Sequence, residues 1–257
     1  MKNRKKALQR MVQTSLFIAL CFVGTLVSIP FGASKVHLGN LLCLLAGLLC
    51  GPWVGGISGG VGMLFADLAS GYPYTTYLRT FVLKFSMGFL IGWLYRLLLK
   101  KDVKGTGLLF AGAVVSSLLF GGGLSFYLLK PEDPYGLPLL ILSSVLFGFF
   151  LAAVCFLKKL DPSKKILLFS LLCALGANVV GEFFLRFGIN LLLGVGTEEA
   201  WIVSLSKLPA ALLTSIVSIL GALLLFYPLY RATARFNPLD DLAPYLMLNK
   251  KQGFERE

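Results

Sequence analysis

Apolar residues occur in long runs along the chain, and short polar connections separate these runs. Eight runs stand out: residues 11–29, 38–51, 53–70, 77–99, 107–129, 137–157, 166–194 and 201–230. A bilayer core about 30 Å thick requires ~20 mostly apolar residues per helix, and each backbone amide in lipid must bond within its own segment. The pattern therefore predicts an all-α integral membrane protein, a compact bundle of about six to eight transmembrane helices in a single membrane domain, 1–257.

The second run is short for a full span, and only Gly51-Pro52 separates it from the third. These two runs are predicted to form a tight hairpin. Composition agrees with a membrane environment, because 57% of the residues are hydrophobic and 14% are charged, against roughly 25% charged residues in a soluble domain. Mean hydropathy is +0.82. The sequence contains no recognisable soluble domain.

Basic residues predict the orientation of the bundle. Four clusters hold 18 of the 24 Lys and Arg residues: 2–10, 96–104, 158–165 and 231–256. With eight spans, all four clusters fall on the same side, and an excess of Lys and Arg marks the cytoplasmic side. The basic N-terminus, 1–10, and the tail, 231–257, are thus expected in the cytoplasm. This distribution explains the net charge of +12 without nucleic acid.

Polar side chains recur every four residues in the seventh run, at Asn178, Glu182, Arg186 and Asn190. The spacing places them along one side of a helix, and polar groups inside a membrane are costly, which makes them candidates for function. One interpretation is an ion pair between Glu182 and Arg186, with the asparagines bonding to neighbouring helices. The other is a polar ligand cavity lined by these side chains. The two are compatible, since an ion pair can border a site.

A second group of polar and aromatic residues surrounds the start of the fourth run. It contains Tyr72, Tyr74, Tyr77 and Lys84, with Asp67 at the end of the third run. The tyrosines fit either an interfacial aromatic belt or a surface that stacks on a ring-shaped ligand. Lys84 fits either extension toward the membrane surface or pairing with Asp67. The predicted topology places the group at the outer face, so all five are candidate ligand contacts.

Small residues also follow a four-residue spacing. Four glycines do so across the second and third runs, namely Gly47, Gly51, Gly55 and Gly59, and Ser15 and Ala19 do so in the first. Such faces let helices approach closely. Most are expected to be internal packing. The glycine-rich helices, and above all Ser15 and Ala19, are candidates for docking another membrane subunit.

Motifs for catalysis and for metal or cofactor binding are weak. Residues 56–60 match G-x-S-x-G around Ser58, but the single histidine, His37, lies upstream and no strand–turn–helix context surrounds the serine. The chain has no P-loop, no H-E-x-x-H and no C-x-x-C, and its five cysteines lack metal spacing. The sequence predicts no metal, no cofactor and no enzyme, with any ATP hydrolysis on another chain. A membrane enzyme built on Ser58 is the least favoured hypothesis.

Two stretches carry a resemblance to a known family. Residues 35–40 and 45–52 are followed by Gly55-Gly56, Ala66-Asp67-Leu68, Ser70-Gly71-Tyr72 and the span from Thr80 to Gly88. This run is similar to the S components of energy-coupling factor (ECF) vitamin transporters, in their riboflavin and pyridoxine-type branch, and residues 225–230 resemble the family's last helix. The resemblance covers 11–100 and 166–230. Members have six helices, so it implies that 107–157 is an extra helical hairpin.

The resemblance implies a substrate-capture subunit in the plasma membrane of a prokaryote, binding a small water-soluble vitamin or related compound from outside. It also implies partners, namely a transmembrane coupling subunit and two cytoplasmic ATPases. An alternative is a self-sufficient, ion-coupled secondary transporter, in which Asp67, Lys84, Glu182 and Arg186 relay protons or ions. The sequence leaves the identity of the ligand open.

Overall fold

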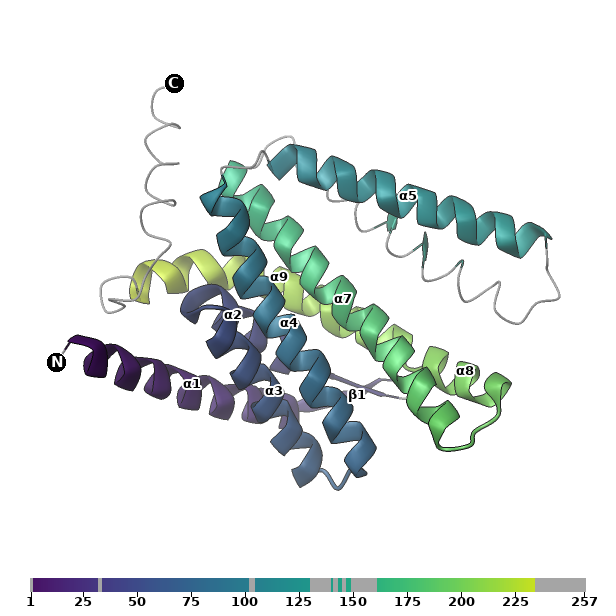
Figure 1. Cartoon of the computed structure of the whole chain (residues 1–257), viewed down its shortest axis with the longest axis horizontal. Helices are drawn as coiled ribbons and strands as arrows, with labels where there is room; N and C mark the ends of the chain where they lie inside the picture. The colour runs from purple at the N-terminus through teal and green to yellow at the C-terminus, as the bar shows by residue number, and fades with distance from the viewer. Residues whose placement is uncertain are drawn as a thin grey trace.

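The computed structural model describes residues 2–31, 34–101, 105–129 and 161–233, with a few positions between 140 and 148. This part of the chain is helical except for one two-stranded hairpin (Figure 1). In chain order its elements are α1 (Lys2–Leu26), β1 (Ser28–Phe31), β2 (Ser34–His37), α2 (Gly39–Cys50), α3 (Pro52–Ala69), α4 (Tyr74–Lys100), α5 (Gly105–Leu129), α7 (Pro162–Leu192), α8 (Thr197–Ser206) and α9 (Leu208–Thr233).

Several helices match the predicted membrane spans. Four stretches are long and apolar enough to cross a bilayer: Arg4–Leu26, Tyr74–Lys100, Ser163–Leu192 and Thr197–Thr233. The prediction of an all-α, multi-pass membrane protein is thus confirmed. By contrast, α2 has 12 residues, about 18 Å of helix, which is too short for a core of ~30 Å. Most of the predicted run 137–157 lies outside the described residues.

The α2–α3 hairpin is held together by glycine. Gly51 joins the two helices at a φ of 106°, a conformation that glycine adopts without the steric penalty of a side chain. A side chain on Gly55 would collide with the backbone of Gly47 in α2 and of Gly88 in α4. The glycine-rich faces therefore lie buried between helices, where they permit close packing. This corrects the hypothesis that these faces dock a partner.

The bundle core lies between α2, α4, α7 and α9. Leu44, Ile91, Leu171 and Phe226, one from each helix, are fully buried there. Phe226 also meets the ring of Tyr95 edge-on, with ring centroids 5.5 Å apart. Outside this core, α1 packs mainly against α3, and α5 lies along α7 at the edge of the bundle (Figure 1). The core thus fixes how the ends of the four central helices meet.

Two local features were not predicted from the sequence. The connection before α2 is an antiparallel β-hairpin in which Ser28 pairs with His37. The run predicted at 201–230 is broken into α8 and α9 at Lys207. Pro209 explains the new start, because proline lacks a backbone N–H and is tolerated in the first turn of a helix. Both features lie at the end of the bundle where a polar cavity is found.

Candidate ligand-binding site

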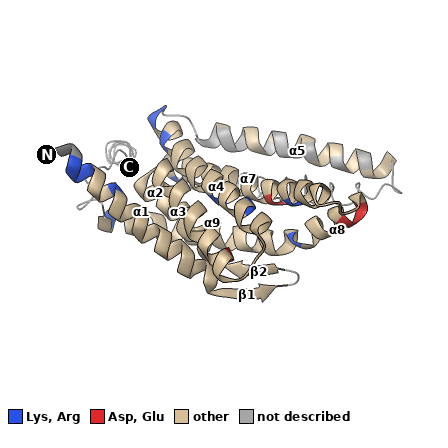
Figure 2. Ribbon diagram, turned by 60° about the horizontal axis from the view of Figure 1, so that its bottom comes forward, with Lys and Arg blue, Asp and Glu red and all other residues tan. Residues whose placement is uncertain are grey.

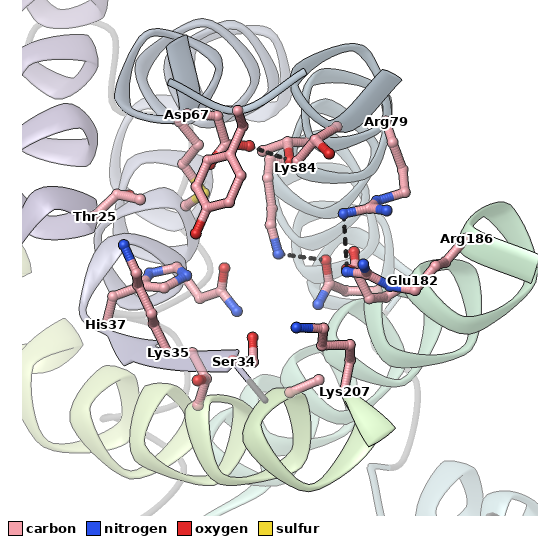
Figure 3. A pocket seen from close by; sticks show the side chains of 18 of the residues that line it. Thr25, Ser34, Lys35, His37, Asp67, Arg79, Lys84, Glu182, Arg186 and Lys207 are labelled. Carbon is pink, nitrogen blue, oxygen red and sulfur yellow. Dashed lines mark hydrogen bonds and ion pairs between the residues drawn. The ribbon is translucent and has the colours of Figure 1, made fainter. Parts of the chain in front are cut away.

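A polar cavity of about 200 Å³ lies at one end of the bundle. Its walls come from the last turn of α1, the strand β2, the beginning of α2 and the end of α3. The first half of α4, the second half of α7 and the beginning of α9 complete them (Figure 3). Each helix thus contributes the end that the basic clusters predict to face outward. Segments far apart in the sequence meet at this one place.

The lining is mostly polar and rich in ionisable side chains. Five basic residues, two carboxylates and one histidine face the cavity: Lys35, Arg79, Lys84, Arg186, Lys207, Asp67, Glu182 and His37. Several are deeply buried, since Arg79 and Lys84 are each only 8% exposed. Burying charge is costly unless it is paired or hydrogen-bonded. The partners of these groups therefore indicate what the cavity can bind.

Glu182 lies at the centre of an ion-pair cluster. Its Oε1 accepts from Nη2 of Arg186 at 2.5 Å and lies 3.3 Å from Nη2 of Arg79. The predicted pair between Glu182 and Arg186 is therefore present, and it borders the cavity, so both interpretations of the stripe on α7 apply together. Sequence spacing identified the partner on the same helix, whereas the second arginine comes from α4.

Lys84 and Asp67 have different partners from those considered at the sequence level. Nζ of Lys84 donates to Oδ1 of Asn178 at 2.8 Å, while Asp67 accepts from the hydroxyl of Thr80 at 2.5 Å. Among the described residues, no carboxylate lies within 4.0 Å of Nζ of Lys84. Burial also rules out extension of Lys84 to the membrane surface. The side chain instead points into the cavity (Figure 3).

His37 links the β-hairpin to the start of α2. Its Nδ1 accepts from the backbone N–H of Gly39 at 3.2 Å, which satisfies one of the donors left open at a helix N-terminus. Burial, with help from the nearby Lys84, lowers the pKa of His37 to about 4. The ring is therefore neutral at pH 7. Because Nδ1 is the acceptor, the proton resides on Nε2, which is available as a donor.

Six of the nine residues predicted as ligand contacts line this cavity: Asp67, Tyr72, Lys84, Asn178, Glu182 and Arg186. The other three do not. Asn190 lies one turn beyond Arg186 toward the end of α7, Tyr74 is 64% exposed, and Tyr77 is half-buried outside the lining. Their role as ligand contacts is not supported by the geometry.

The predicted ligand contacts did not include Arg79, Lys207 or His37, which also face the cavity. For α4 a signal existed, because Thr76, Thr80 and Lys84 repeat the four-residue spacing of the stripe on α7, and Arg79 lies on the same side. His37 and Lys207 belong to no such repeat. Both come from connections whose direction is set by the fold.

Comparison with known proteins decides the family. The sequence model of a family described as ECF-type riboflavin transporter, S component, matches residues 5–129, from α1 to the end of α5. A Pyrococcus woesei protein, described as an uncharacterized protein in a gap 3′ region, is 36% identical over 107 residues, which are 38% of this chain and 71% of that protein. The chain belongs to the S-component family of ECF transporters. No solved structure matches it.

S components are the substrate-binding subunits of ECF importers, and this chain is therefore the substrate-binding subunit of such an importer. The hypothesis of a membrane enzyme gains no support in this S component. Ser58 is buried against α1, where its hydroxyl donates to the carbonyl oxygen of Thr14 at 3.2 Å. His37, by contrast, faces the cavity.

The S component also carries an apolar groove between α1 and α3. It is lined by Ser15, Ile18, Ala19, Phe22, Phe65, Leu68 and Ala69. Ser15 and Ala19 are exposed, unlike the buried glycines of α2 and α3. Ser15 and Ala19 are small and lie one turn apart in its lining, so another helix can approach closely there.

Proposed function

We propose that this S component captures a small, water-soluble vitamin or related compound from outside the cell. The observation that carries the proposal is the polar, charged cavity at one end of an otherwise apolar bundle. Its walls are the helix ends that the basic clusters predict to face outward. Charged groups inside a membrane protein are costly unless they serve a site or a pathway. A ligand site offsets this cost, because the buried charged groups form hydrogen bonds and ion pairs with a polar ligand.

The orientation of the bundle supports capture from outside. Basic residues gather at the start of α1 and the end of α4, and the acidic Glu198 and Glu199 begin α8 at the other end (Figure 2). The cavity lies at the end with the acidic residues. With the basic end in the cytoplasm, the cavity opens toward the outside in the plasma membrane of a prokaryote, and both termini are cytoplasmic.

In this proposal the lining residues have distinct roles. Asn178, Glu182, Arg186 and Lys84 orient the polar groups of the ligand, and Tyr72 closes the cavity from the loop before α4. Tyr72 is suited to this because it is 39% exposed and lies beneath Nζ of Lys35, 5.5 Å from its ring centroid. Asp67 positions Thr80. Tyr74, Tyr77 and Asn190 lie outside the lining, so we assign them no contact with the bound ligand.

Transport requires partners in this proposal, because ATP hydrolysis is placed on other chains. A transmembrane coupling subunit docks in the groove at Ser15 and Ala19, and two cytoplasmic ATPases drive release. The core formed by 11–100 and 166–230 binds the ligand, while the hairpin 107–157 is an addition beside it. The position of α5 at the edge of the bundle, along α7, is consistent with that division.

The first test is mass spectrometry of small molecules released from the purified protein. A stoichiometric compound supports capture and identifies the substrate. Uptake of that compound is then measured in cells that contain the coupling subunit with active or inactive ATPases. Uptake that persists with inactive ATPases but collapses with an ionophore would instead support ion-coupled secondary transport, which no observation in the described part of the chain favours.

A further inference from the structure

The charges around the cavity do not balance. Five basic side chains face it, against the two carboxylates of Asp67 and Glu182, and His37 is neutral. Among the described lining residues, basic side chains thus outnumber carboxylates by three. Lys35 is exposed, but Arg79 and Lys84 are buried. A neutral ligand would leave this buried positive charge only partly compensated, whereas an anion would compensate more of it.

Lys84 shows the imbalance most clearly. It is 8% exposed and donates to the neutral amide oxygen of Asn178. An ammonium group has three N–H donors, and the described residues provide Nζ of Lys84 with no carboxylate within 4.0 Å. A buried cation normally has a counter-charge, because its loss of hydration is otherwise uncompensated. Glu182 and Asp67 lie near enough to act on it electrostatically, but among the described residues neither forms an ion pair with Lys84.

The arginines are also incompletely satisfied. Arg79 and Arg186 share the single carboxylate of Glu182, so this cluster alone carries one excess positive charge. The Nε atoms of both arginines are buried and have no hydrogen-bond partner. Buried donors without partners are uncommon in folded proteins and point to an absent acceptor. An oxyanion supplies several acceptor atoms at once and suits guanidinium groups particularly well.

Building on the proposed function, we propose that the captured compound is an organic acid whose carboxylate or phosphate group binds among Lys84, Arg79 and Arg186. Lys207 reinforces the site, since its side chain points into the same central space as Lys84 (Figure 3). The Nε2–H of His37 and the hydroxyl of Thr214 remain for neutral polar groups of the ligand. The cavity of about 200 Å³ favours a small acid, because drug-sized ligands usually occupy ~300–1,000 Å³.

Matched pairs of vitamins that differ in the acid group provide the test. The full chain in detergent is titrated by calorimetry with nicotinate and nicotinamide, pantothenate and pantothenol, pyridoxine 5′-phosphate and pyridoxine, and riboflavin 5′-phosphate and riboflavin. Inorganic phosphate is a further probe. We expect an acid to bind at least ~100-fold more tightly than its neutral counterpart, since several charge-assisted hydrogen bonds are at stake. The preferred pair distinguishes a carboxylate from a phosphate.

Lys84→Met separates a ligand contact from a structural role. Binding of the preferred acid is expected to weaken about 10- to 150-fold, which corresponds to loss of one hydrogen bond to a charged group. The thermal midpoint of the ligand-free variant is expected to equal or exceed that of the wild type, because an uncompensated buried cation has been removed. A lower midpoint would indicate a structural role instead. Lys101→Met, at the exposed end of the same helix, is the matched control and leaves both values unchanged.

The remaining outcomes distinguish this proposal from the proposed function. A neutral compound recovered from the purified protein, or a neutral member of a pair that binds as tightly as its acid, overturns the organic-acid proposal and leaves capture intact. Binding of inorganic phosphate with no preference for any organic acid also overturns it. If nothing is recovered and no probe binds, capture itself fails, and the organic-acid proposal fails with it.

Discussion

Replacing Glu182 with glutamine tests whether one carboxylate holds two helices together at the cavity. Glu182 lies 2.5 Å from Arg186 on its own helix and 3.3 Å from Arg79 on α4. The exposed fractions of the three side chains are between 7% and 17%. Glutamine retains the size and one carbonyl acceptor but removes the charge. Both guanidinium groups then lose their counter-charge in a buried place.

The expected loss of stability follows from the burial of this cluster. Removing one partner of a buried ion pair costs about 3–5 kcal/mol. Glu182 retains 17% side-chain exposure and glutamine still accepts one hydrogen bond, so we expect about 2–4 kcal/mol. Since 1 kcal/mol shifts the thermal midpoint of a chain of this size by roughly 2–4 °C, the ligand-free variant should unfold about 5–15 °C earlier. Tryptophan fluorescence during heating in detergent measures the shift.

Two further variants make the result decisive. Glu198→Gln removes an exposed carboxylate in the first turn of α8 and should cost less than about 1 kcal/mol. The double variant Glu182→Gln/Arg186→Gln removes one of the two cations left without a counter-charge, so it should recover at least ~1 kcal/mol relative to the sum of the single changes. A midpoint for Glu182→Gln within ~2 °C of the wild type, or strict additivity in the double variant, would refute the reasoning.

Three other changes probe packing, docking and pH. Gly55→Ala forces a methyl group into the backbone of α2 and α4, so it should lower the free energy of unfolding by about 1–3 kcal/mol, seen as a lower thermal midpoint. Gly107→Ala, where nothing lies within 4 Å of the added methyl group, should leave the midpoint unchanged. Ala19→Trp fills the groove beside Ser15 and should abolish co-purification with the coupling subunit while ligand affinity is retained; loss of both would indicate misfolding. The pKa of His37 is about 4 in the folded protein against 6.5 ordinarily, so the unfolded chain binds more protons between these values and stability should fall as pH drops from 6.5 to 4. His37→Gln should flatten that slope, and an unchanged slope would contradict the assignment.

The spans and the polar stripe on α7 were predictable from the sequence for a physical reason. Lipid forces each segment to satisfy its own backbone, so a run of apolar residues such as 77–99 already specifies a helix. Within such a helix the four-residue spacing of Asn178, Glu182 and Arg186 is enough to place them on one side. The basic clusters likewise predict an orientation without any knowledge of packing.

The partners of these side chains depended on tertiary structure. Helical spacing predicts neighbours only on the same helix, so it gave the Glu182–Arg186 pair but not Arg79, which reaches Glu182 from α4. Asp67 was a reasonable partner for Lys84 by charge, yet the packing of α4 on α7 brings Asn178 to Nζ of Lys84 and leaves Asp67 to Thr80. His37 enters the site because the β-hairpin turns it toward α2. Periodicity along one segment carries no information about which segments pack together. The cavity forms only where several of them meet, so the sequence pattern could not locate it.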